Sequence, residues 1–188
     1  VVYIDTESVA RPLWKVQSAL RLGTANSAAL YYFKQIAFER ALDNQFLRHR
    51  ESDFDVIHRI TPVSSAIPSP IASWSKIPFV LGPINGGLEY PPGYADLLTK
   101  EREWLRWFRR ALMHLPYIQS TYRNAAVILA AFDHTIRTLP EELRYKTMSF
   151  PENGVDTSRF RQNGREAQEN SIEILYAGRL VPFKCVDV

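Results

Sequence analysis

The chain has 188 residues, 46% of them hydrophobic and 23% charged, which is enough for one sizeable core or for one domain and the start of a second. Its formal net charge is +3 and its pI is about 9.0, a mildly basic balance that favours anionic partners such as phosphates or an acidic membrane surface. A single cysteine, Cys185, excludes an internal disulfide framework and fits a reducing compartment, and no apolar run approaches the roughly 20 residues of a membrane span.

The first half of the chain predicts an alternation of helices and strands. Apolar residues three and four positions apart indicate helices, and short apolar runs beside glycine and proline indicate strands covered on both faces. In chain order we expect a helix over 13–22 that Pro12 begins, a helix over 28–48 capped by Asn26 or Ser27, a strand over 54–58, one turn of helix near 71–74 and a strand over 77–82.

The second half continues this alternation. In chain order we expect a glycine- and proline-rich loop over 83–93, a helix over 94–115, a strand over 124–130, a helix over 134–139 capped by Asp133, a strand over 144–150, a polar linker over 156–170 and a strand over 172–177. Strands that alternate with helices are typical of a parallel sheet, so the sequence predicts an α/β fold.

The predicted helix over 94–115 has an aromatic side and a basic side. Trp104, Trp107 and Phe108 share one side, and arginines such as Arg106 occupy the other. Two interpretations stay open. The aromatic side packs on the sheet, which we favour, or it lies in a membrane interface.

The segment Ala177-Gly178-Arg179-Leu180, followed by Lys184, has the clearest chemical meaning. A strand that ends at Ala177 would deliver Gly178 and Arg179 to the carboxyl edge of a sheet, where α/β proteins bind ligands. Glycine lets a ligand approach the backbone, the arginine fork suits phosphate oxygens and the lysine adds a point charge. Taken alone, the segment is equally compatible with a solvated surface turn.

A second segment, Pro151-Glu152-Asn153-Gly154-Val155-Asp156 with Phe160 after it, stands about two dozen residues upstream. Asn153-Gly154 is a turn pair, because both residues tolerate positive φ. Taken alone, it predicts a tight turn.

Together these two segments resemble glycosyltransferase family 4, whose members are retaining transferases with the two-domain GT-B architecture. Members typically carry P-x-N-G-V-D-x-x-x-F where the chain enters the second domain and G-R-L-x-x-x-K-G at the donor site. The first pattern is met from Pro151 to Phe160. The second is met from Gly178 to Lys184, with Cys185 in place of the usual glycine.

The resemblance extends to the earlier strands. The runs 54–58 and 77–82 look like family strands that face the interdomain cleft, and the segment 82–87 is similar to the G-P-x-x-G-G loop of one bacterial subgroup. Many members place a cleft histidine after the second of these strands, where this chain has none. His58 is the nearest candidate for an acceptor-side contact, although a histidine at a strand end is often structural.

The resemblance implies a role for each of these residues. Arg179 and Lys184 would be the catalytic cations that neutralise the departing diphosphate. The residues implied in substrate binding are Gly178, His58, Asn85, Gly86, Gly87, Asn153 and Gly154.

The resemblance also implies the organisation of the protein. Residues 1–150 would be the later part of an N-terminal, Rossmann-like acceptor domain, and residues 151–188 the start of the donor-binding domain, with both domains incomplete. The intact enzyme would move a sugar from a nucleotide-diphosphate donor to a glycan or lipid-linked acceptor. It would need no metal and no other cofactor, and it would work in the cytoplasm or at the inner face of the membrane. The E-x7-E carboxylates would fall beyond Val188, so the chain alone would be inactive.

Other classes stay open beside this one: a sugar-nucleotide epimerase, a phosphorylase, and a non-catalytic interaction subunit. No G-x-S-x-G or phosphate-loop pattern occurs, and the four histidines and the cysteine lack metal-ligand spacing. Arginines are scattered over predicted helices rather than interleaved with aromatics on a sheet, so no nucleic-acid partner is expected.

Overall fold

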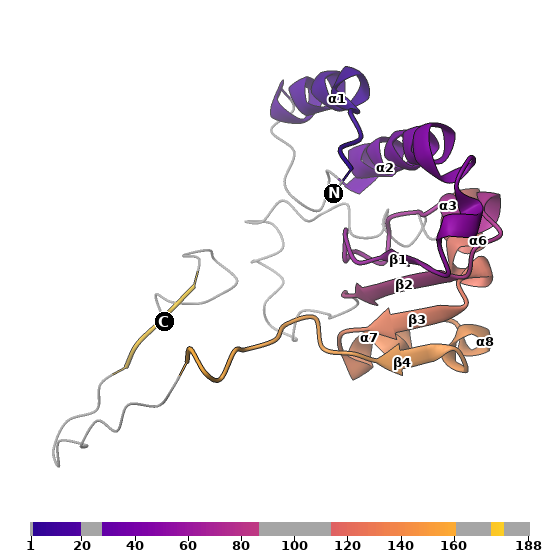
Figure 1. The fold of residues 1–188 in the computed structure, drawn as a ribbon. Helices are drawn as coiled ribbons and strands as arrows, with labels where there is room; N and C mark the ends of the chain where they lie inside the picture. The colour runs from indigo at the N-terminus through magenta and orange to yellow at the C-terminus, as the bar shows by residue number, and fades with distance from the viewer. Residues whose placement is uncertain (1, 20–27, 87–113, 161–173, 179–188) are drawn as a thin grey trace, which may run out of the picture. The chain divides into compact units, whose positions relative to one another are not determined.

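The computed structural model describes residues 2–19, 28–86, 114–160 and 174–178 of the chain. The chain divides into two compact units, Val1–Glu152 and Asn153–Val188. The first unit contains a four-stranded sheet in the order β1-β2-β3-β4, with every described pair of neighbouring strands parallel (Figure 1). This confirms the predicted α/β fold with a parallel sheet. The identity of the two units as acceptor-side and donor-side domains stays a prediction.

The strands are short, and each begins two or three residues later in the chain than predicted. Their bounds are Ile57–Arg59 for β1, Phe79–Ile84 for β2, Val127–Ala130 for β3 and Thr147–Ser149 for β4. The ladder begins where Ile57 N–H donates to the carbonyl of Pro78 over 2.9 Å. Phe54, which the sequence placed in the first strand, instead packs its ring against Phe46 at a centroid distance of 5.6 Å.

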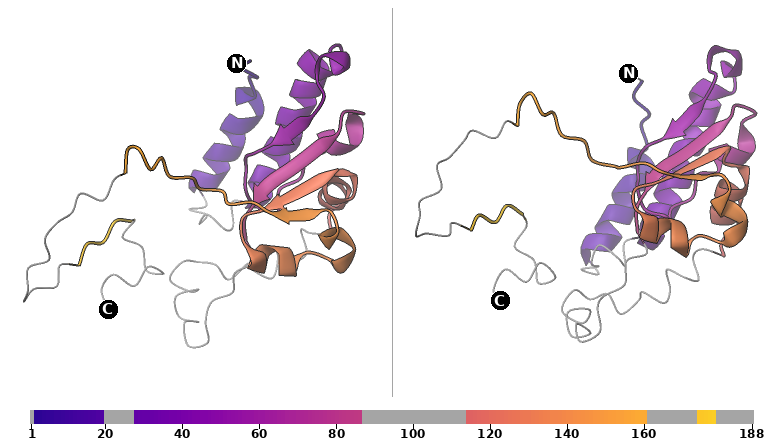
Figure 2. Two further views of the ribbon diagram at one scale, coloured as in Figure 1. Left: turned by 60° about the horizontal axis from the view of Figure 1, so that its bottom comes forward. Right: turned by 90° about the horizontal axis from the view of Figure 1, so that it is seen from below.

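Helices precede, connect and follow these strands. They are α1 (Glu7–Ala19), α2 (Ala28–Leu42), the π-helix η1 (Asp43–Leu47), the 3-10 helix η2 (Glu51–Asp53), α3 (Ile71–Trp74), α6 (Pro116–Asn124), α7 (Asp133–Thr138) and α8 (Glu141–Arg144). The α1 and α2 helices lie side by side (Figure 2), and α3 packs on α6. Among the helices in the described ranges, none has both the length and the apolar character that a membrane crossing requires.

The α1 helix begins earlier than predicted. Its first N–H group, on Glu7, donates to the carboxylate of Asp5 over 2.8 Å, so an acidic side chain before the helix satisfies one of the unpaired donors of its first turn. Pro12 therefore lies inside the helix, where it has no N–H group to donate to the carbonyl of Ser8. The prediction that Pro12 begins the helix is wrong.

The described helices near the C-terminal strands also differ from the sequence predictions. The sequence did not predict α6 or α8. A proline marks the start of each helix, because Pro116 is the first residue of α6 and Pro140 directly precedes α8. Asp133 is the first residue of α7 rather than its cap, because Phe132 has the extended backbone of the cap position. Of the predicted helix over 94–115, residues 94–113 lie outside the described part of the chain.

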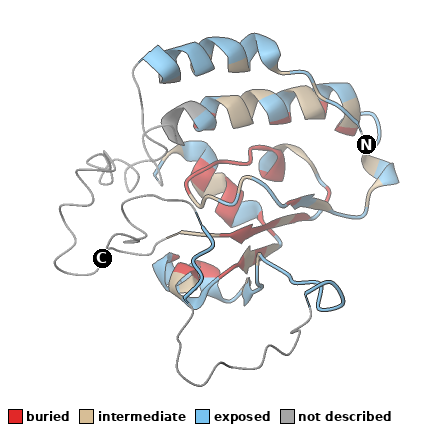
Figure 3. Ribbon diagram, turned by 90° about the vertical axis from the view of Figure 1, so that its left-hand side faces the viewer, coloured by how far each residue is buried: buried red, intermediate tan, exposed pale blue. Residues whose placement is uncertain are grey.

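One face of the sheet forms the hydrophobic core. Phe79 and Leu81 of β2 and Ile128 of β3 are fully buried on this face, against Ile118 and Tyr122 of α6. Figure 3 shows the resulting buried centre between exposed outer helices. The parallel strands therefore rest on α6 and α3, as connections in a parallel sheet require.

The opposite face of the sheet has less cover within the described residues. His58, Val80, Leu129 and Met148 alternate along their strands with the buried residues, and all four are half-buried or exposed. The register places His58 beside Val80, and Leu129 beside Met148. The expectation of cover on both faces is nevertheless confirmed for β2, in which every residue is buried except the half-buried Val80.

The second unit is described over residues 153–160 and 174–178. The predicted strand over 172–177 is wrong in its described part, because residues 174–177 have no strand structure. Ile174 and Leu175 are almost fully exposed. A strand needs a hydrogen-bonded neighbour, and none pairs with this segment among the described residues.

Candidate functional site

The carboxyl ends of the four strands lie at one edge of the sheet, because all four run in the same direction. At this edge the loop after β1 joins the end of β2. Asn85 N–H donates to the carbonyl of Val63 over 2.7 Å, and Asn85 forms an isolated parallel bridge with Ser64. The backbone thus fixes Asn85, one of the predicted substrate-binding residues, where ligands of α/β proteins bind.

The side chain of Asn85 reaches the end of the fourth strand. Its amide nitrogen donates to Oε1 of Glu152 over 3.0 Å, across the end of β3. The second carboxylate oxygen of Glu152 is shielded from solvent and has no donor among the described residues. A shielded acceptor without a partner is costly, so this oxygen is available to a donor from water, from a ligand or from the part of the chain outside the described ranges.

Gly86 follows with a backbone conformation that favours glycine, at φ +141°. Its carbonyl accepts a hydrogen bond from Thr135 Oγ1 of α7 over 2.8 Å. A Cβ at this position would lie 3.4 Å from Ser65 Oγ, in the loop after β1. Gly86 is therefore held between two elements, while Gly87, predicted to act with it, lies outside the described residues.

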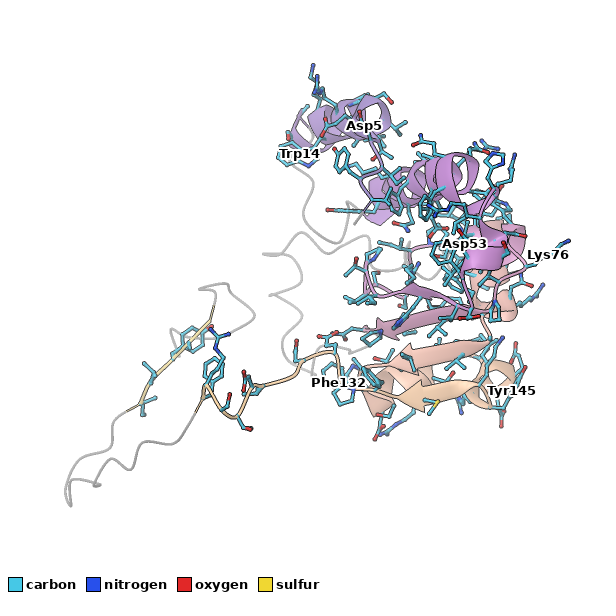
Figure 4. All side chains as sticks on the ribbon, in the orientation of Figure 1. Asp5, Trp14, Asp53, Lys76, Phe132 and Tyr145 are labelled. Carbon is cyan, nitrogen blue, oxygen red and sulfur yellow. The ribbon has the colours of Figure 1, made fainter. Side chains whose placement is uncertain are left out.

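An aromatic pair stands at the same edge. Phe132, directly after β3, stacks on the ring of His134 at a centroid distance of 5.2 Å and an interplanar angle of 10°. Phe132 is 44% exposed, and its ring projects at the carboxyl ends of the strands (Figure 4). The sequence analysis did not predict Phe132, His134 or Thr135 as site residues. A signal for them was present, because an aromatic residue and the start of a helix follow directly after the strand.

His58 lies within β1 rather than at the loop edge. Its Nε2 atom is 2.7 Å from the carbonyl oxygen of Gly82. Because a carbonyl only accepts, Nε2 carries the proton, and in the neutral ring Nδ1 remains an acceptor. The bond ties His58 to the backbone of β2, which is a structural contact, and its predicted contact with an acceptor stays a prediction.

The predicted turn at Asn153-Gly154 is wrong. Both residues are exposed, Gly154 lacks a positive φ, and the turn forms three residues later. There the carboxylate of Asp156 accepts from Ser158 Oγ at 2.6 Å and from Ser158 N–H at 2.9 Å. These hydrogen bonds lower the pKa of Asp156, with the hydroxyl bond as the largest cause. An Asx turn at Asp156 thus replaces the expected Asn-Gly turn.

Part of the predicted donor segment lies outside the described residues. Gly178 is described and exposed, and a Cβ there would lie 2.7 Å from the hydroxyl oxygen of Tyr176. Arg179 and Lys184, the two predicted catalytic cations, fall in the range that the structure does not describe. The structure therefore brings together Asn85 and Gly86 of the predicted residues and leaves the others apart or undescribed.

A buried polar network that sequence reasoning missed shapes the loop after β1. Glu39 of α2 is only 2% exposed, and its carboxylate accepts from Ser69 Oγ at 2.5 Å and from the N–H of Ile71 at 2.9 Å. Ser69 N–H in turn donates to Thr121 Oγ1 of α6 over 2.6 Å. Ser69 thus fastens the loop that carries Ser64 and the carbonyl of Val63 to α2 and α6, which we call the Glu39–Ser69 brace.

Arg59 completes this brace from the end of β1. Its Nη1 donates to the carbonyls of Ile67 and Pro68 and to Ser69 Oγ, at 2.9, 3.1 and 3.2 Å. Burial lowers the pKa of Arg59, while the charge of Glu39 opposes that change. Burial also raises the pKa of Glu39, against the lowering effect of its hydrogen bonds. Glu39 and Arg59 are both buried, so each of the two groups is stabilised in its charged form by the opposite charge of the other.

The signal for this network was present in the sequence of α2. Tyr32 and Glu39 of α2 and Asp43, the first residue of η1, are spaced seven and four residues apart, so they share one side of this helical segment. This side is the buried one, whereas Phe33 of the same helix is 58% exposed. The acidic Glu39 on the buried side of the helix indicated a buried polar contact. A pattern of hydrophobic residues alone does not detect such a residue.

Within the described ranges, no three His, Cys, Asp or Glu side chains gather so as to hold a metal ion. Comparison of the chain with protein-family models, with curated proteins and with solved structures finds no match.

Proposed function

We propose that the protein that contains this chain is a retaining glycosyltransferase of GT-B architecture, which transfers a sugar from a nucleotide-diphosphate donor to a glycan or lipid-linked acceptor. The observation that carries the proposal is the pair of segments from Pro151 to Phe160 and from Gly178 to Lys184, which follow a parallel α/β unit in the order expected of such an enzyme.

The edge of the first unit supports an acceptor-side role. Sugar hydroxyls both donate and accept hydrogen bonds, and the edge offers the amide of Asn85 beside the carboxylate of Glu152. The exposed ring of Phe132 provides an apolar surface for the C–H face of a sugar. Polar groups beside an aromatic surface, at the carboxyl ends of parallel strands, suit a carbohydrate better than a flat apolar ligand.

The two cations have the same proposed role in the chemistry on the donor side. During transfer, the bond between the anomeric carbon and the diphosphate oxygen breaks, the acceptor oxygen bonds to that carbon, and the hydroxyl proton is released. Negative charge grows on the departing diphosphate, and Arg179 and Lys184 would stabilise it. The nucleotide sugar is consumed, so it is a substrate and not a resident cofactor.

The test uses the full protein that contains this chain. It is incubated with UDP-, GDP- and ADP-linked sugars, with and without glycan and lipid-linked acceptors, and the release of nucleoside diphosphate is measured. We expect release that depends on an acceptor, and we expect Arg179→Ala and Lys184→Ala each to lower kcat by about 10²–10³-fold. Arg123→Ala, an exposed arginine of α6, is the matched control and should leave kcat unchanged.

Other outcomes would replace the proposal. Formation of an isomerised sugar with free UDP would identify an epimerase, and sugar release that requires inorganic phosphate would identify a phosphorylase. Binding of nucleotide sugar without any turnover would identify a non-catalytic subunit.

A further inference from the structure

Asparagine is followed by glycine at 85–86, at 153–154 and at 163–164. The structure describes the first two of these pairs, and their surroundings differ. An Asn-Gly pair is chemically reactive, because glycine has no Cβ to shield its backbone nitrogen from the side chain of the asparagine. The contacts around each pair therefore decide whether that side chain can reach the nitrogen.

The pair Asn153-Gly154 has no contact that would hold it. Both residues are exposed, and neither belongs to a helix, a strand or a turn. A Cβ added at Gly154 would have no heavy atom within 4 Å beyond the neighbouring residues of the chain. Within the described ranges, no hydrogen bond involves the side chain of Asn153 or the N–H of Gly154. The side-chain carbonyl carbon of Asn153 is therefore free to rotate onto the nitrogen of Gly154.

The pair Asn85-Gly86 is half-buried and held on three sides. Asn85 N–H donates to the carbonyl of Val63 over 2.7 Å, and its side-chain amide donates to Glu152 over 3.0 Å. The carbonyl of Gly86 accepts from Thr135 Oγ1 over 2.8 Å. A reaction between the side chain and the backbone of this pair requires these hydrogen bonds to break first.

We propose that Asn153 is a site of spontaneous deamidation, whereas Asn85 is protected by its contacts. Hydroxide removes the proton from the N–H of Gly154, and this nitrogen forms a bond with Cγ of Asn153. The bond from Cγ to Nδ2 breaks, and ammonia leaves with a proton taken from water. Water then opens the cyclic imide at either of its two carbonyl carbons. One opening gives aspartate, and the other gives isoaspartate, in which the main chain runs through the side-chain carbon.

The modification changes both the charge and the length of this segment. It places a new carboxylate between two existing ones, Glu152 and Asp156. Isoaspartate also adds a methylene group to the main chain at the first residue of the second unit. If Asn153 binds substrate, aged protein should lose activity in proportion to the modified fraction. This consequence rests on the proposed function, but the modification itself does not.

The experiment follows the two pairs in the full protein that contains this chain. The protein is incubated at mildly alkaline pH, digested with trypsin at intervals, and analysed by peptide mass spectrometry. Cleavage after lysine and arginine places Asn153 in the peptide 147–159 and Asn85 in the peptide 77–100, neither of which contains another asparagine. We expect the deamidated fraction to grow at least about tenfold faster at Asn153, because the hydrogen bonds of Asn85 must break before it can react.

Two controls separate the effect of the fold from that of the sequence. Gly154→Ala, which adds a methyl group in open space, should slow deamidation at Asn153 by steric hindrance and leave the rate at Asn85 unchanged. In a denaturant that unfolds the protein, the rates at Asn153 and Asn85 should approach each other, because the contacts of Asn85 are then lost.

Three results would overturn the proposal. They are equal rates at the two sites in the folded protein, a faster rate at Asn85, and a difference between the sites that persists unchanged after unfolding. None of these measurements involves a nucleotide sugar, so a failure of the proposed enzymatic function would leave them unaffected.

Discussion

Replacing Glu39 with alanine tests whether the Glu39–Ser69 brace supports the first unit. The substitution removes the acceptors for the N–H of Ile71 and for Ser69 Oγ, which belong to almost fully buried residues, and the acceptor for the side-chain amide of Gln35. It also removes the negative charge that balances the positive charge of the buried Arg59 guanidinium. The free energy of unfolding should therefore fall through three lost hydrogen bonds and one uncompensated charge.

The size of the effect follows from these losses. A buried polar group left without a partner costs about 1–3 kcal/mol, and removal of one member of a buried charge pair costs about 3–5 kcal/mol in total. We expect Glu39→Ala to lower the free energy of unfolding by about 3–5 kcal/mol. With a urea dependence of about 2 kcal/mol per molar, the midpoint should move down by about 1.5–2.5 M.

The assay is urea unfolding followed by circular dichroism, with Glu142→Ala as control because Glu142 is an exposed acidic residue on α8. The control should stay within about 0.5 kcal/mol of the original protein. Equal midpoints for Glu39→Ala and Glu142→Ala would refute the reasoning, since they would mean that water enters and satisfies the brace.

Three further predictions address pH, backbone geometry and one buried hydroxyl. Burial raises the folded-state pKa of Glu39 above its ordinary value of 4.5, so ionisation of Glu39 disfavours the folded state. The free energy of unfolding, measured relative to that of Glu39→Gln in unfolding curves from pH 4 to 8, should therefore be highest below pH 4.5 and decline as the pH rises through the raised pKa. Gly82→Ala should cost at least about 3 kcal/mol or prevent folding, because φ is +116° and the new Cβ would collide with backbone, whereas Gly154→Ala, in open space, should leave the melting temperature unchanged. Tyr122→Phe should cost about 1–2 kcal/mol at neutral pH, since the carbonyl of Ser65 loses its 2.7 Å hydrogen bond, and a fully retained midpoint would show that water replaces the hydroxyl.

The sequence predicted the class of the fold because that class follows from local patterns. The apolar runs that became β2 and β3 and the helical turn at Ile71–Trp74 are each contained within a few neighbouring residues. The boundaries were less predictable, because pairing with another strand decides where a strand begins. Ile57 starts β1 only because Pro78 offers its carbonyl there.

The candidate site was predictable only where local signals marked it. The glycine-rich segment after the second strand indicated Asn85 and Gly86. Glu152 was missed because it lies 67 residues from Asn85, and no local pattern announces a contact over that distance. Glu39 was missed for a different reason: a charged residue on a helix usually faces water, and only the packing of α2 shows that this one does not.

The brace also bears on the order in which the first unit folds. Ser69 bonds Glu39 across 30 residues and Thr121 across 52, so the loop after β1 reaches its final shape only when α2 and α6 are both in place. Closing such long segments costs entropy before the contacts repay it, and non-local contacts slow folding. We expect substitutions at Ser69 to speed unfolding while leaving the folding rate almost unchanged, which makes the loop beside Asn85 a late-forming part of the molecule.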